Sequence, residues 1–306
     1  MLQLEDLRLV CALSRSPSLS AAARSLNVTP PALSMRLKKL EQLFGVALAV
    51  RTAHRLSLTA EGEQLAVQGL DLLSRLDALP ELLKGEGSGL SGPLRISAPF
   101  GFGRRHVAPL VARFAAAHPG IRISLDLLEA PWPDRRDVDV VVHIGAVRDS
   151  SWVAHTLAAN ERWLCASPGY LKGWAPPLRQ PRDVLDHACL CIRENDEDVT
   201  LWHYRKRGTP KARPGGLESL RIVPAMTSND GDVARQWAEQ GLGLVLRSQW
   251  DAAVAVAEGR LVRLLPDWLF GDAPVLALVP TRKGRAVRVR AFVEFLQAGF
   301  APRPPW

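Results

Sequence analysis

Apolar residues in the first 60 positions recur at the three- and four-residue spacing of α-helices. A first helix should end at Ser16-Pro17, because proline interrupts helical hydrogen bonding, and a second, alanine-rich helix should follow Ser20 as its cap. Thr29 can cap a third helix that has Pro30 at its first position and ends before Gly45. The pattern therefore predicts helices over 4–14, 21–26 and 30–44.

The third predicted helix has an apolar side and a polar side. At about 100° per residue, the apolar side consists of Leu33, Leu37, Leu40 and Phe44. The opposite side is short-chained, polar and basic, and consists of Pro31, Ser34, Met35 and Lys38. Small residues, hydrogen-bond donors and cations are what a helix in the DNA major groove requires, although the solvated face of an ordinary helix pair has a similar composition.

Two short alternating stretches after this helix predict a β-hairpin with a basic tip. The stretches 46–48 and 56–58 flank a loop that carries Arg51, His54 and Arg55. Beside a helix in the major groove, such a tip would contact a neighbouring phosphate strand or the minor groove. Three helices and a hairpin together predict a winged helix-turn-helix domain over 1–59.

A long amphipathic helix, serving as a linker, is predicted over 60–88. Its apolar seam alternates at three and four residues, as in a coiled coil, and comprises Gly62, Leu65, Gly69, Leu72, Leu76, Leu79 and Leu83. Such a seam either pairs with a second copy of the chain or packs on the core of its own chain. Pro80 should kink or shorten the helix, and the glycines of 85–92 predict a hinge.

Strands and helices alternate over 89–306, which predicts an α/β domain with parallel sheets. Strands are expected over 94–98, 121–128, 138–144, 163–166, 189–193, 243–246 and 275–279, and helices over 103–118, 232–240, 250–258 and 287–300. This order indicates two similar lobes, lobe I over 89–160 and 267–306 and lobe II over 161–266. The two crossovers between the lobes should lie near 159–161 and 265–268.

The loops at the carboxyl ends of these strands define a candidate effector site, because open α/β sheets bind ligands there. The loops contain Ser97, Pro99, Phe100, Gly101, Phe102, Gly145, Val147, Arg148, Arg193, Asn195, Thr227 and Asn229. Backbone N–H groups, hydroxyls, an amide and arginines suit a small carboxylate. Each loop alone could be an ordinary turn, in which Ser97 or Asn229 only caps a helix.

No catalytic, cofactor or metal motif is visible in the sequence. Gly101 and Gly103 form a G-x-G, but His106 occupies the third glycine position of a dinucleotide fingerprint. The four cysteines include one C-x-C at 189–191 without a second ligand pair, so we expect buried free thiols. An enzyme in the α/β domain would need an acid/base or nucleophile set that is not found, so neither catalysis nor a cofactor is predicted.

Composition and charge refine this picture. A chain of 306 residues, 47% of them hydrophobic, is long enough for two or more domains and too apolar to be disordered. The net charge of +8 divides into +5 over 1–60, −4 over 61–88 and +7 over 89–306, as suits a nucleic-acid-binding head on an acidic stalk. No uncharged apolar run approaches the about 20 residues of a membrane span, and the start of the chain is acidic where a secretory signal is basic. We expect no membrane contact and a cytoplasmic location.

The run SLSAAARSLNVTPPALSMRLKKLEQLFGVALAVRTAHRLSLTAEG at 18–62 resembles the amino-terminal signature of LysR-type transcriptional regulators. The resemblance implies DNA contacts at Thr29, Pro30, Pro31, Ser34, Lys38, Arg51 and Arg55. Met35 departs from the usual Arg or Lys, and Ala49-Val50 from the usual Phe-acid pair, which affects target sequence and affinity. The family resemblance further implies an effector domain built like periplasmic solute-binding proteins and a linker helix that pairs two subunits.

Within that family, the stretches SNDGDVARQWAEQGLGLVLRSQWD at 228–251 and GRLVRLLPDW at 259–268 resemble regulators of tartrate and malate breakdown. They suggest a hydroxy- or dicarboxylic acid as effector. We therefore expect a homo-oligomeric transcription factor that binds double-stranded DNA at an interrupted inverted repeat and responds to a small carboxylate. The alternative is a cytoplasmic small-molecule-binding module whose head contacts a protein, which would show no salt-dependent affinity for DNA.

Overall fold

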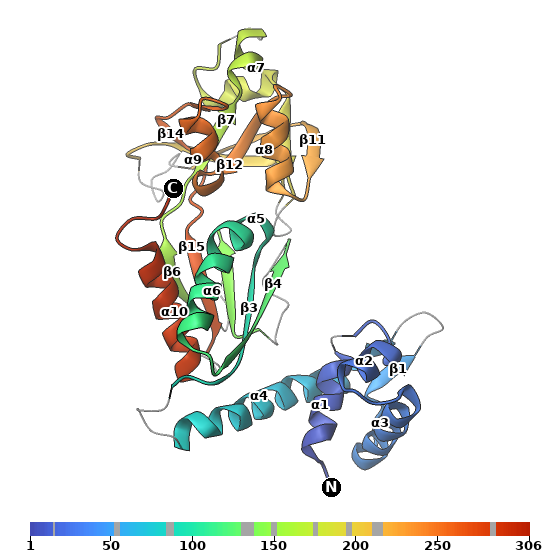
Figure 1. Cartoon of the computed structure of the whole chain (residues 1–306). Helices are drawn as coiled ribbons and strands as arrows, with labels where there is room; N and C mark the ends of the chain where they lie inside the picture. Colours follow the sequence, from blue (N-terminus) through green and yellow to red (C-terminus); the bar gives the residue numbers. More distant parts are fainter. Residues whose placement is uncertain are drawn as a thin grey trace. The chain divides into compact units, whose positions relative to one another are not determined.

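The computed structural model describes residues 1–14, 16–51, 56–83, 89–129, 138–147, 152–173, 177–193, 198–209, 217–281 and 286–306. It divides into two compact units, Met1–Gly92 and Pro93–Trp306, each considered by itself. The first unit comprises α1 Leu4–Leu13, α2 Leu19–Ser25, α3 Pro30–Phe44, β1 Ala49–Arg51, β2 Leu56–Leu58 and α4 Ala60–Leu83 (Figure 1).

The predicted helices of the first unit are present, and local caps set their ends. Thr29 caps α3, and Gly45 ends the helix in the left-handed conformation with φ 70°. The cap of α2 is Ser18, whose side chain accepts a hydrogen bond from the N–H of Ala21, so our assignment of Ser20 is wrong by half a turn. Because Ser18 follows Ser16-Pro17 so closely, the turn between α1 and α2 is short.

The core of the first unit packs the apolar side of α3 against α1, α2 and the start of α4. Leu33, Leu37 and Leu40 are buried, as predicted, but Phe44 in the last turn of α3 is 42% exposed. Leu48, which follows the helix, is buried in this core, and its backbone N–H donates to the Glu41 carboxylate. β1 begins at Ala49, directly after the buried Leu48, so the expected strand over 46–48 is wrong.

The seam of α4 divides into two parts. Its first turns pack inside the unit, where Gly62 and Gly69 lie against the hairpin and α1, and the Cys11 thiol donates to the Ala66 carbonyl. Further along, Leu72 and Leu76 are 49% and 41% exposed, and Leu79 continues this exposed stripe. The helix continues through Pro80 to Leu83, so the proline does not shorten it as expected. The first half of the seam therefore packs on its own chain, and the second half lies open.

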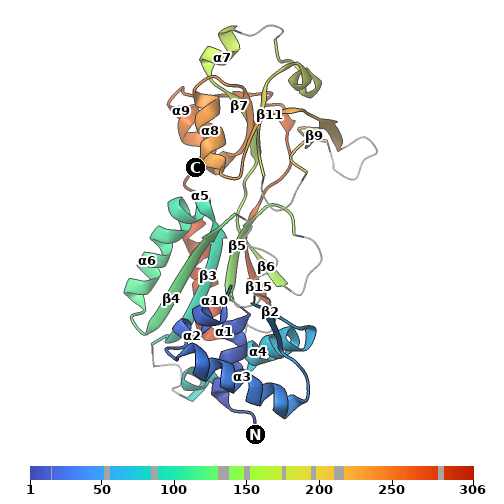
Figure 2. The same cartoon turned by 90° about the vertical axis from the view of Figure 1, so that its right-hand side faces the viewer.

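The second unit consists of two α/β lobes (Figures 1 and 2). Lobe I comprises β3 Gly92–Pro99, α5 Phe100–Phe102, the π-helix η1 Gly103–Val107, α6 Ala108–Ala117, β4 Ile121–Leu128, β5 Val140–Ile144, β6 Trp152–Ala158, β15 Val275–Pro280 and α10 Val287–Phe300. Lobe II comprises β7 Arg162–Ala166, α7 Pro168–Gly173, η2 Pro181–Asp186, β8 Cys189–Ile192, β9 Leu201–Lys206, β10 Glu218–Arg221, β11 Pro224–Ser228, α8 Gly231–Glu239, β12 Leu244–Ser248, α9 Gln249–Ala257, β13 Val262–Leu264 and β14 Trp268–Leu269.

Both main sheets are mixed, so the prediction of parallel sheets is wrong in part. Lobe I has the strand order β4-β3-β5-β15-β6, with β3 and β5 parallel and β15 antiparallel to both of its neighbours. Lobe II has the order β11-β8-β12-β7-β13, in which β7 is antiparallel to both neighbours. The chain leaves lobe I after β6 and returns in β15, and two adjacent strands that leave and return must run in opposite directions.

The sheet of lobe II is covered on both faces, as alternating burial along its strands requires. Leu190 and Val245 pack against the small residues of α8 and α9 on one face. Cys189 and Leu244, one residue earlier on the same strands, pack on the other face with Trp202 of β9. Trp268 and Leu269 pair with β9 as β14, so the second crossover lies over 270–274, later than the expected 265–268.

All four cysteines are buried free thiols, as predicted. Burial raises the pKa of Cys165 and Cys189 to about 12 and that of Cys191 to about 11. These thiols therefore stay protonated and act as small apolar side chains. Among the described residues, no helix combines the length and apolar character that a membrane span needs.

Candidate functional site

The first candidate site is the exposed side of α3. Its cap Thr29 accepts a hydrogen bond from the N–H of Ala32 through Oγ1 at 3.4 Å, and the prolines that follow are exposed. Met35 is 61% exposed, Lys38 is exposed and Ser34 is half-buried. Six of the nine predicted DNA-contacting residues therefore lie together in the first turns of one helix: Thr29, Pro30, Pro31, Ser34, Met35 and Lys38. Arg51 ends β1. His54, Arg55 and the side chain of Arg51 lie outside the described residues.

The position of α3 is secured by Arg36, which our sequence reasoning did not single out. Arg36 Nε donates to Asp6 Oδ1 at 2.7 Å, and its NH2 group donates to Gln3 Oε1 at 2.9 Å. Asp6 also accepts from the backbone N–H of Gln3 at 2.8 Å and is buried. One carboxylate thus caps α1 and holds an arginine of α3, which fixes the relative orientation of the two helices.

The second candidate site is a cavity of about 590 Å³ between the two lobes. Lobe I contributes Pro99 to Phe102, Arg104, Arg105, Glu129 and Ile144 to its lining, and lobe II contributes Asn229 to Asp232 and Arg247, Ser248, Trp250 and Asp251. These residues lie at or directly after the carboxyl ends of β3, β4, β5, β11 and β12. The cavity therefore lies where an open α/β sheet is expected to bind its ligand.

A buried carboxylate organises the arginines of this cavity. Asp251, whose side chain is 2% exposed, accepts a hydrogen bond from Arg247 Nε at 2.9 Å and lies 3.5 Å from Arg105 NH1. Arg235 Nε approaches the same carboxylate at 3.3 Å. Three guanidinium groups thus surround one aspartate of α9: Arg235 comes from α8 and Arg247 from β12 of lobe II, whereas Arg105 comes from lobe I. Buried charges of this kind are held only when paired.

The first turn of α8 adds acidic groups to the cavity wall. Burial by itself would raise the pKa of Asp232, but the hydrogen bond and charge of Arg235 outweigh burial and lower that pKa. Gly231 faces the Arg247 guanidinium so closely that a Cβ atom would lie 2.2 Å from its NH2 group. A side chain at position 231 would therefore have to displace the Arg247 guanidinium, which Asp251 holds at the start of α8.

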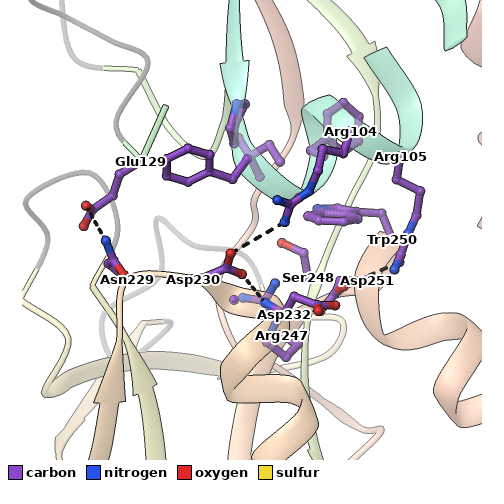
Figure 3. A pocket seen from close by; sticks show the side chains of 16 residues that line it. Arg104, Arg105, Glu129, Asn229, Asp230, Asp232, Arg247, Ser248, Trp250 and Asp251 are labelled. Carbon is purple, nitrogen blue, oxygen red and sulfur yellow. Dashed lines mark hydrogen bonds and ion pairs between the residues drawn. The ribbon is translucent and has the colours of Figure 1, made fainter. Parts of the chain in front are cut away.

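Besides the contact of Arg105 with Asp251, two further polar contacts among the described residues join the lobes across the cavity, and Figure 3 shows both. Asn229 Nδ2 of lobe II donates to Glu129 Oε2 of lobe I at 3.0 Å. Arg104 of lobe I lies 3.5 Å from Asp230 of lobe II, and both side chains retain contact with solvent. A movement that separates the lobes at this edge would break both pairs.

An aromatic cluster forms the wall behind Arg105. Trp250 lies edge-on to Phe102 and His106, with ring centroids 5.3 Å and 5.7 Å apart, and Arg105 lies over its ring. Trp306 contacts the same His106 ring at 5.1 Å from the carboxyl-terminal segment. Burial first, and then the charge of Arg105, lower the pKa of His106 to about 4, whereas Asp251 opposes the shift. His106 is therefore neutral near pH 7.

A second cavity, of about 440 Å³, adjoins the first. It shares Arg247 and Ser248 with the first cavity and is lined by Gly145 of lobe I, several residues of lobe II and the second crossover. Among its polar residues are Arg162, Asp198 and His203. Both cavities therefore border the end of β12.

The structure brings together about half of the predicted effector-site residues. The residues that line the first cavity are Pro99, Phe100, Gly101, Phe102 and Asn229, and Gly145 lines the second. Ser97 is fully buried beneath the first loop, and Val147 packs with Trp152 against the sheet of lobe I. Arg193 and Thr227 line neither of these cavities. Arg148 and Asn195 lie outside the described residues.

Sequence reasoning missed most of the charged cavity residues. Arg104 and Arg105 follow the G-x-G directly, and Arg247 and Asp251 are four residues apart across the start of a helix. An Arg–Asp pair at that spacing just after a strand is a usable signal for a charged ligand pocket. The contact between Arg105 and Asp251 joins residues 146 positions apart, and no local pattern indicates it.

The fold and these two sites define a class of protein: a DNA-binding regulator with a winged helix-turn-helix head and an effector-binding domain. Residues 4–63 match the bacterial regulatory helix-turn-helix model of the lysR family, and residues 87–301 match the LysR substrate binding domain. The chain belongs to the LysR family of transcriptional regulators. Members of this family bind DNA and small-molecule effectors and act as oligomers.

Individual relatives share this organisation over nearly the whole chain. The transcriptional regulator DmlR of Escherichia coli K12 is 33% identical over 304 residues, which cover 99% of this chain and 96% of DmlR. The transcriptional activator TtdR of Escherichia coli UTI89 is 30% identical over 96% of this chain and 92% of TtdR. PtxR of Pseudomonas aeruginosa PAO1 is 32% identical over 99% and 95% of the two chains.

Solved full-length structures resemble this chain over nearly its whole length. The full-length virulence activator AphB of Vibrio cholerae, 25% identical, matches with a TM-score of 0.61 over 97% of this chain and 99% of AphB. CrgA of Neisseria meningitidis, 27% identical, matches with a TM-score of 0.57 over 98% and 100% of the two chains. The mixed α/β effector domain and the helical head are thus an established architecture.

Proposed function

We propose that this regulator binds DNA with the exposed side of α3 and the β1–β2 hairpin. We further propose that a small carboxylate bound between the lobes changes how the protein binds DNA. The observation that supports the effector most directly is the arginine-rich cavity, because Arg104, Arg105 and Arg247 are suited to bind carboxylate oxygens. The resemblance of 228–251 and 259–268 to regulators of tartrate and malate breakdown favours a hydroxy- or dicarboxylic acid.

The ion pair of Arg104 with Asp230 also suggests how effector binding changes the protein. A carboxylate that binds Arg104 competes with Asp230, whose contact at 3.5 Å is long and partly exposed. Replacing this contact by a ligand would change how strongly lobe I holds lobe II at that edge. An effector shifts an equilibrium only through such a difference in affinity for two arrangements of the lobes.

The exposed half of α4 supports self-association as part of this function. Leu72, Leu76 and Leu79 form an apolar stripe on a helix that continues beyond the core of its own unit. We propose that this stripe pairs with that of a second copy, which brings two α3 helices to an interrupted inverted repeat. Binding to chromosomal DNA implies that the protein acts in the cytoplasm.

We propose that the cavity binds its ligand without transforming it. The described residues contain no group of three or more His, Cys, Asp or Glu side chains that could hold a metal ion. The histidine behind the cavity, His106, is partly buried and neutral, and its ring packs among aromatic side chains. Turnover of any organic acid by the purified protein would contradict this part of the proposal.

DNA binding is tested by fluorescence anisotropy of the full chain with labelled duplex DNA at rising salt. We expect an affinity that falls steeply with salt, because lysines and arginines release counterions from phosphates. Lys38→Ala should reduce the salt dependence, whereas Lys172→Ala, in α7 of lobe II, should leave it unchanged. If the head contacts a protein instead, the affinity for duplex DNA is weak and Lys38→Ala has no effect.

The effector is tested by titrating malate, tartrate and related acids while recording tryptophan fluorescence. All nine tryptophans lie at or after Trp132, so emission reports on the second unit alone. Arg104→Gln should weaken the response at least tenfold and leave DNA affinity unchanged, and Asn229→Ala should weaken it by less. Thr227→Ala is the matched control, because Thr227 lines neither cavity. A failure of every carboxylate to change emission or thermal stability would contradict the proposed effector class.

A further inference from the structure

The exposed side of α3 has an unbranched apolar side chain at its centre. Leu33, Leu37 and Leu40 face the core, and at about 100° per residue Met35 lies almost directly opposite their mean direction. Met35 is 61% exposed, more than Leu43, which is 48% exposed near the end of the same helix. The side chain that projects furthest from the core in the second turn of α3 therefore carries no hydrogen-bonding group that a base edge could use strongly.

The neighbours of Met35 on α3 are suited to different contacts. Ser34 and Lys38 can contact polar edges and phosphates, since hydroxyls and ammonium groups serve both purposes. Arg36, the arginine next in sequence, is held by Asp6 at 2.7 Å and Gln3 at 2.9 Å on α1. Its guanidinium is thus directed at the head's own first helix. Met35 therefore occupies the centre of the exposed side of α3.

The chemistry of the major groove limits what such a side chain can recognise. Base pairs present hydrogen-bond donors and acceptors there, and the C5-methyl group of thymine is the one apolar feature among them. Residues in the first turns of a recognition helix are those that reach base edges. Building on the DNA-binding function proposed above, we propose that Met35 is a specificity-determining residue that recognises thymine through its C5-methyl group.

Packing and desolvation explain why Met35 would favour the C5-methyl group of thymine over other base edges. A methionine has three flexible torsions and a polarisable sulfur, so its end can follow the surface of a methyl group. Covering one methyl group by apolar atoms changes affinity by about fourfold. Opposite a guanine or a cytosine, the same side chain would bury polar edges without a partner, which is unfavourable. The head should therefore select a T·A pair at one position of each half-site.

The test uses the full-length protein and a duplex that it selects from a random library. Each thymine of the selected site is replaced in turn by deoxyuridine, which removes only the methyl group. We expect about a fourfold loss of affinity at one thymine in each half-site and no change at the others. Met35→Ala should bind the thymine and deoxyuridine duplexes equally, with the salt dependence of the parent protein.

Two further variants make the experiment decisive. Leu43→Ala truncates another exposed apolar side chain of α3, and it should retain the discrimination between thymine and deoxyuridine. Met35→Arg should shift the preferred base at that position from thymine to guanine, which offers two acceptors to an arginine. Equal thermal unfolding of the three variants shows that the head remains folded.

The outcomes separate this inference from the proposed function. If the parent protein selects no duplex, DNA binding itself is wrong. If it selects a site but no thymine distinguishes the parent from Met35→Ala, DNA binding stands and the methyl contact is wrong. Loss of discrimination in Leu43→Ala would also overturn the assignment, because the apolar contact would then lie elsewhere on α3.

Discussion

Asn160 and Ala273 join the two chain segments that connect the lobes of the effector domain. Asn160 Nδ2 donates to the Ala273 carbonyl at 2.8 Å, and the Ala273 N–H donates to the Asn160 carbonyl at 3.1 Å. The side-chain oxygen of Asn160 accepts from the N–H of Trp250 at 3.3 Å. One buried amide therefore holds both crossovers against the first turn of α9, where Trp250 and Asp251 line the cavity.

We expect Asn160→Ala to destabilise the second unit by about 1–3 kcal/mol, because the substitution leaves a buried carbonyl and a buried N–H without their side-chain partner. Asn160→Asp should be at least as harmful, since it replaces the donor by a charge in a buried position. The measurement is urea unfolding followed by tryptophan fluorescence. Asn229→Ala, at an exposed position, serves as control and should change stability by less than about 0.5 kcal/mol. Equal midpoints for Asn160→Ala and the parent would contradict the joining role.

The two glycines of α4 should respond differently to the same substitution. A Cβ atom at Gly62 would lie 2.0 Å from the Leu48 carbonyl oxygen, which is backbone and cannot move without shifting the hairpin. Gly62→Ala should therefore lower the midpoint of thermal unfolding and weaken DNA binding, at a cost of about 1–3 kcal/mol. At Gly69 the nearest atom is the Cys11 sulfur at 3.4 Å, so Gly69→Ala should be neutral or stabilising by up to about 1 kcal/mol. Circular dichroism reports on both, and a larger loss at Gly69 would show that the packing of α4 is misassigned.

The stability of the second unit should fall as the pH falls from 6.5 towards 4. Burial is the main cause that lowers the pKa of His106 to about 4 in the folded protein, whereas a histidine in an unfolded chain has a pKa near 6.5. Between these values the unfolded state binds a proton that the folded state does not, so unfolding becomes more favourable with acid. Denaturation midpoints at pH 7, 6 and 5 measure the effect.

The control for this pH dependence is a histidine outside the aromatic cluster. His106→Gln should flatten the decline between pH 7 and 5, while His203→Gln, at an exposed position of β9, should leave it unchanged. A decline that persists in full in His106→Gln would assign the proton uptake to another group.

The exposed stripe of α4 should determine the oligomeric state. Leu76→Asp places a charge in the middle of the seam, and we expect the molar mass from light scattering to fall to that of a single chain at micromolar concentration. Gln68→Asp adds the same charge at an exposed polar position of α4 and should leave the mass unchanged. DNA affinity should fall with the mass, because two heads bind better than one. An unaltered mass in Leu76→Asp would show that the chain associates through another surface.

Much of the head could be predicted because its signals are local. The cap at Thr29, the proline after it and the glycine at 45 act on hydrogen bonds within a few residues, and α3 begins and ends where they indicate. The apolar spacing also predicted which side of α3 is buried. The spacing failed at Phe44, because whether the last turn of a helix reaches the core depends on how far the neighbouring helices extend, and Phe44 is 42% exposed.

The sequence by itself determined the helices of the head, the linker helix and part of the strands and helices of the two lobes, but it did not indicate strands such as β6, β9 and β11. Tertiary structure alone decided the direction of β15 and β7 in their sheets, the split of the α4 seam, and the meeting of Arg105 with Asp251. Periodicity and capping act over one or two turns, so they can be read from neighbouring residues. The pairing of β15 with β5 and the contact of Arg105 with Asp251 join positions more than 100 residues apart, and their free energy exists only once the chain has brought the partners together.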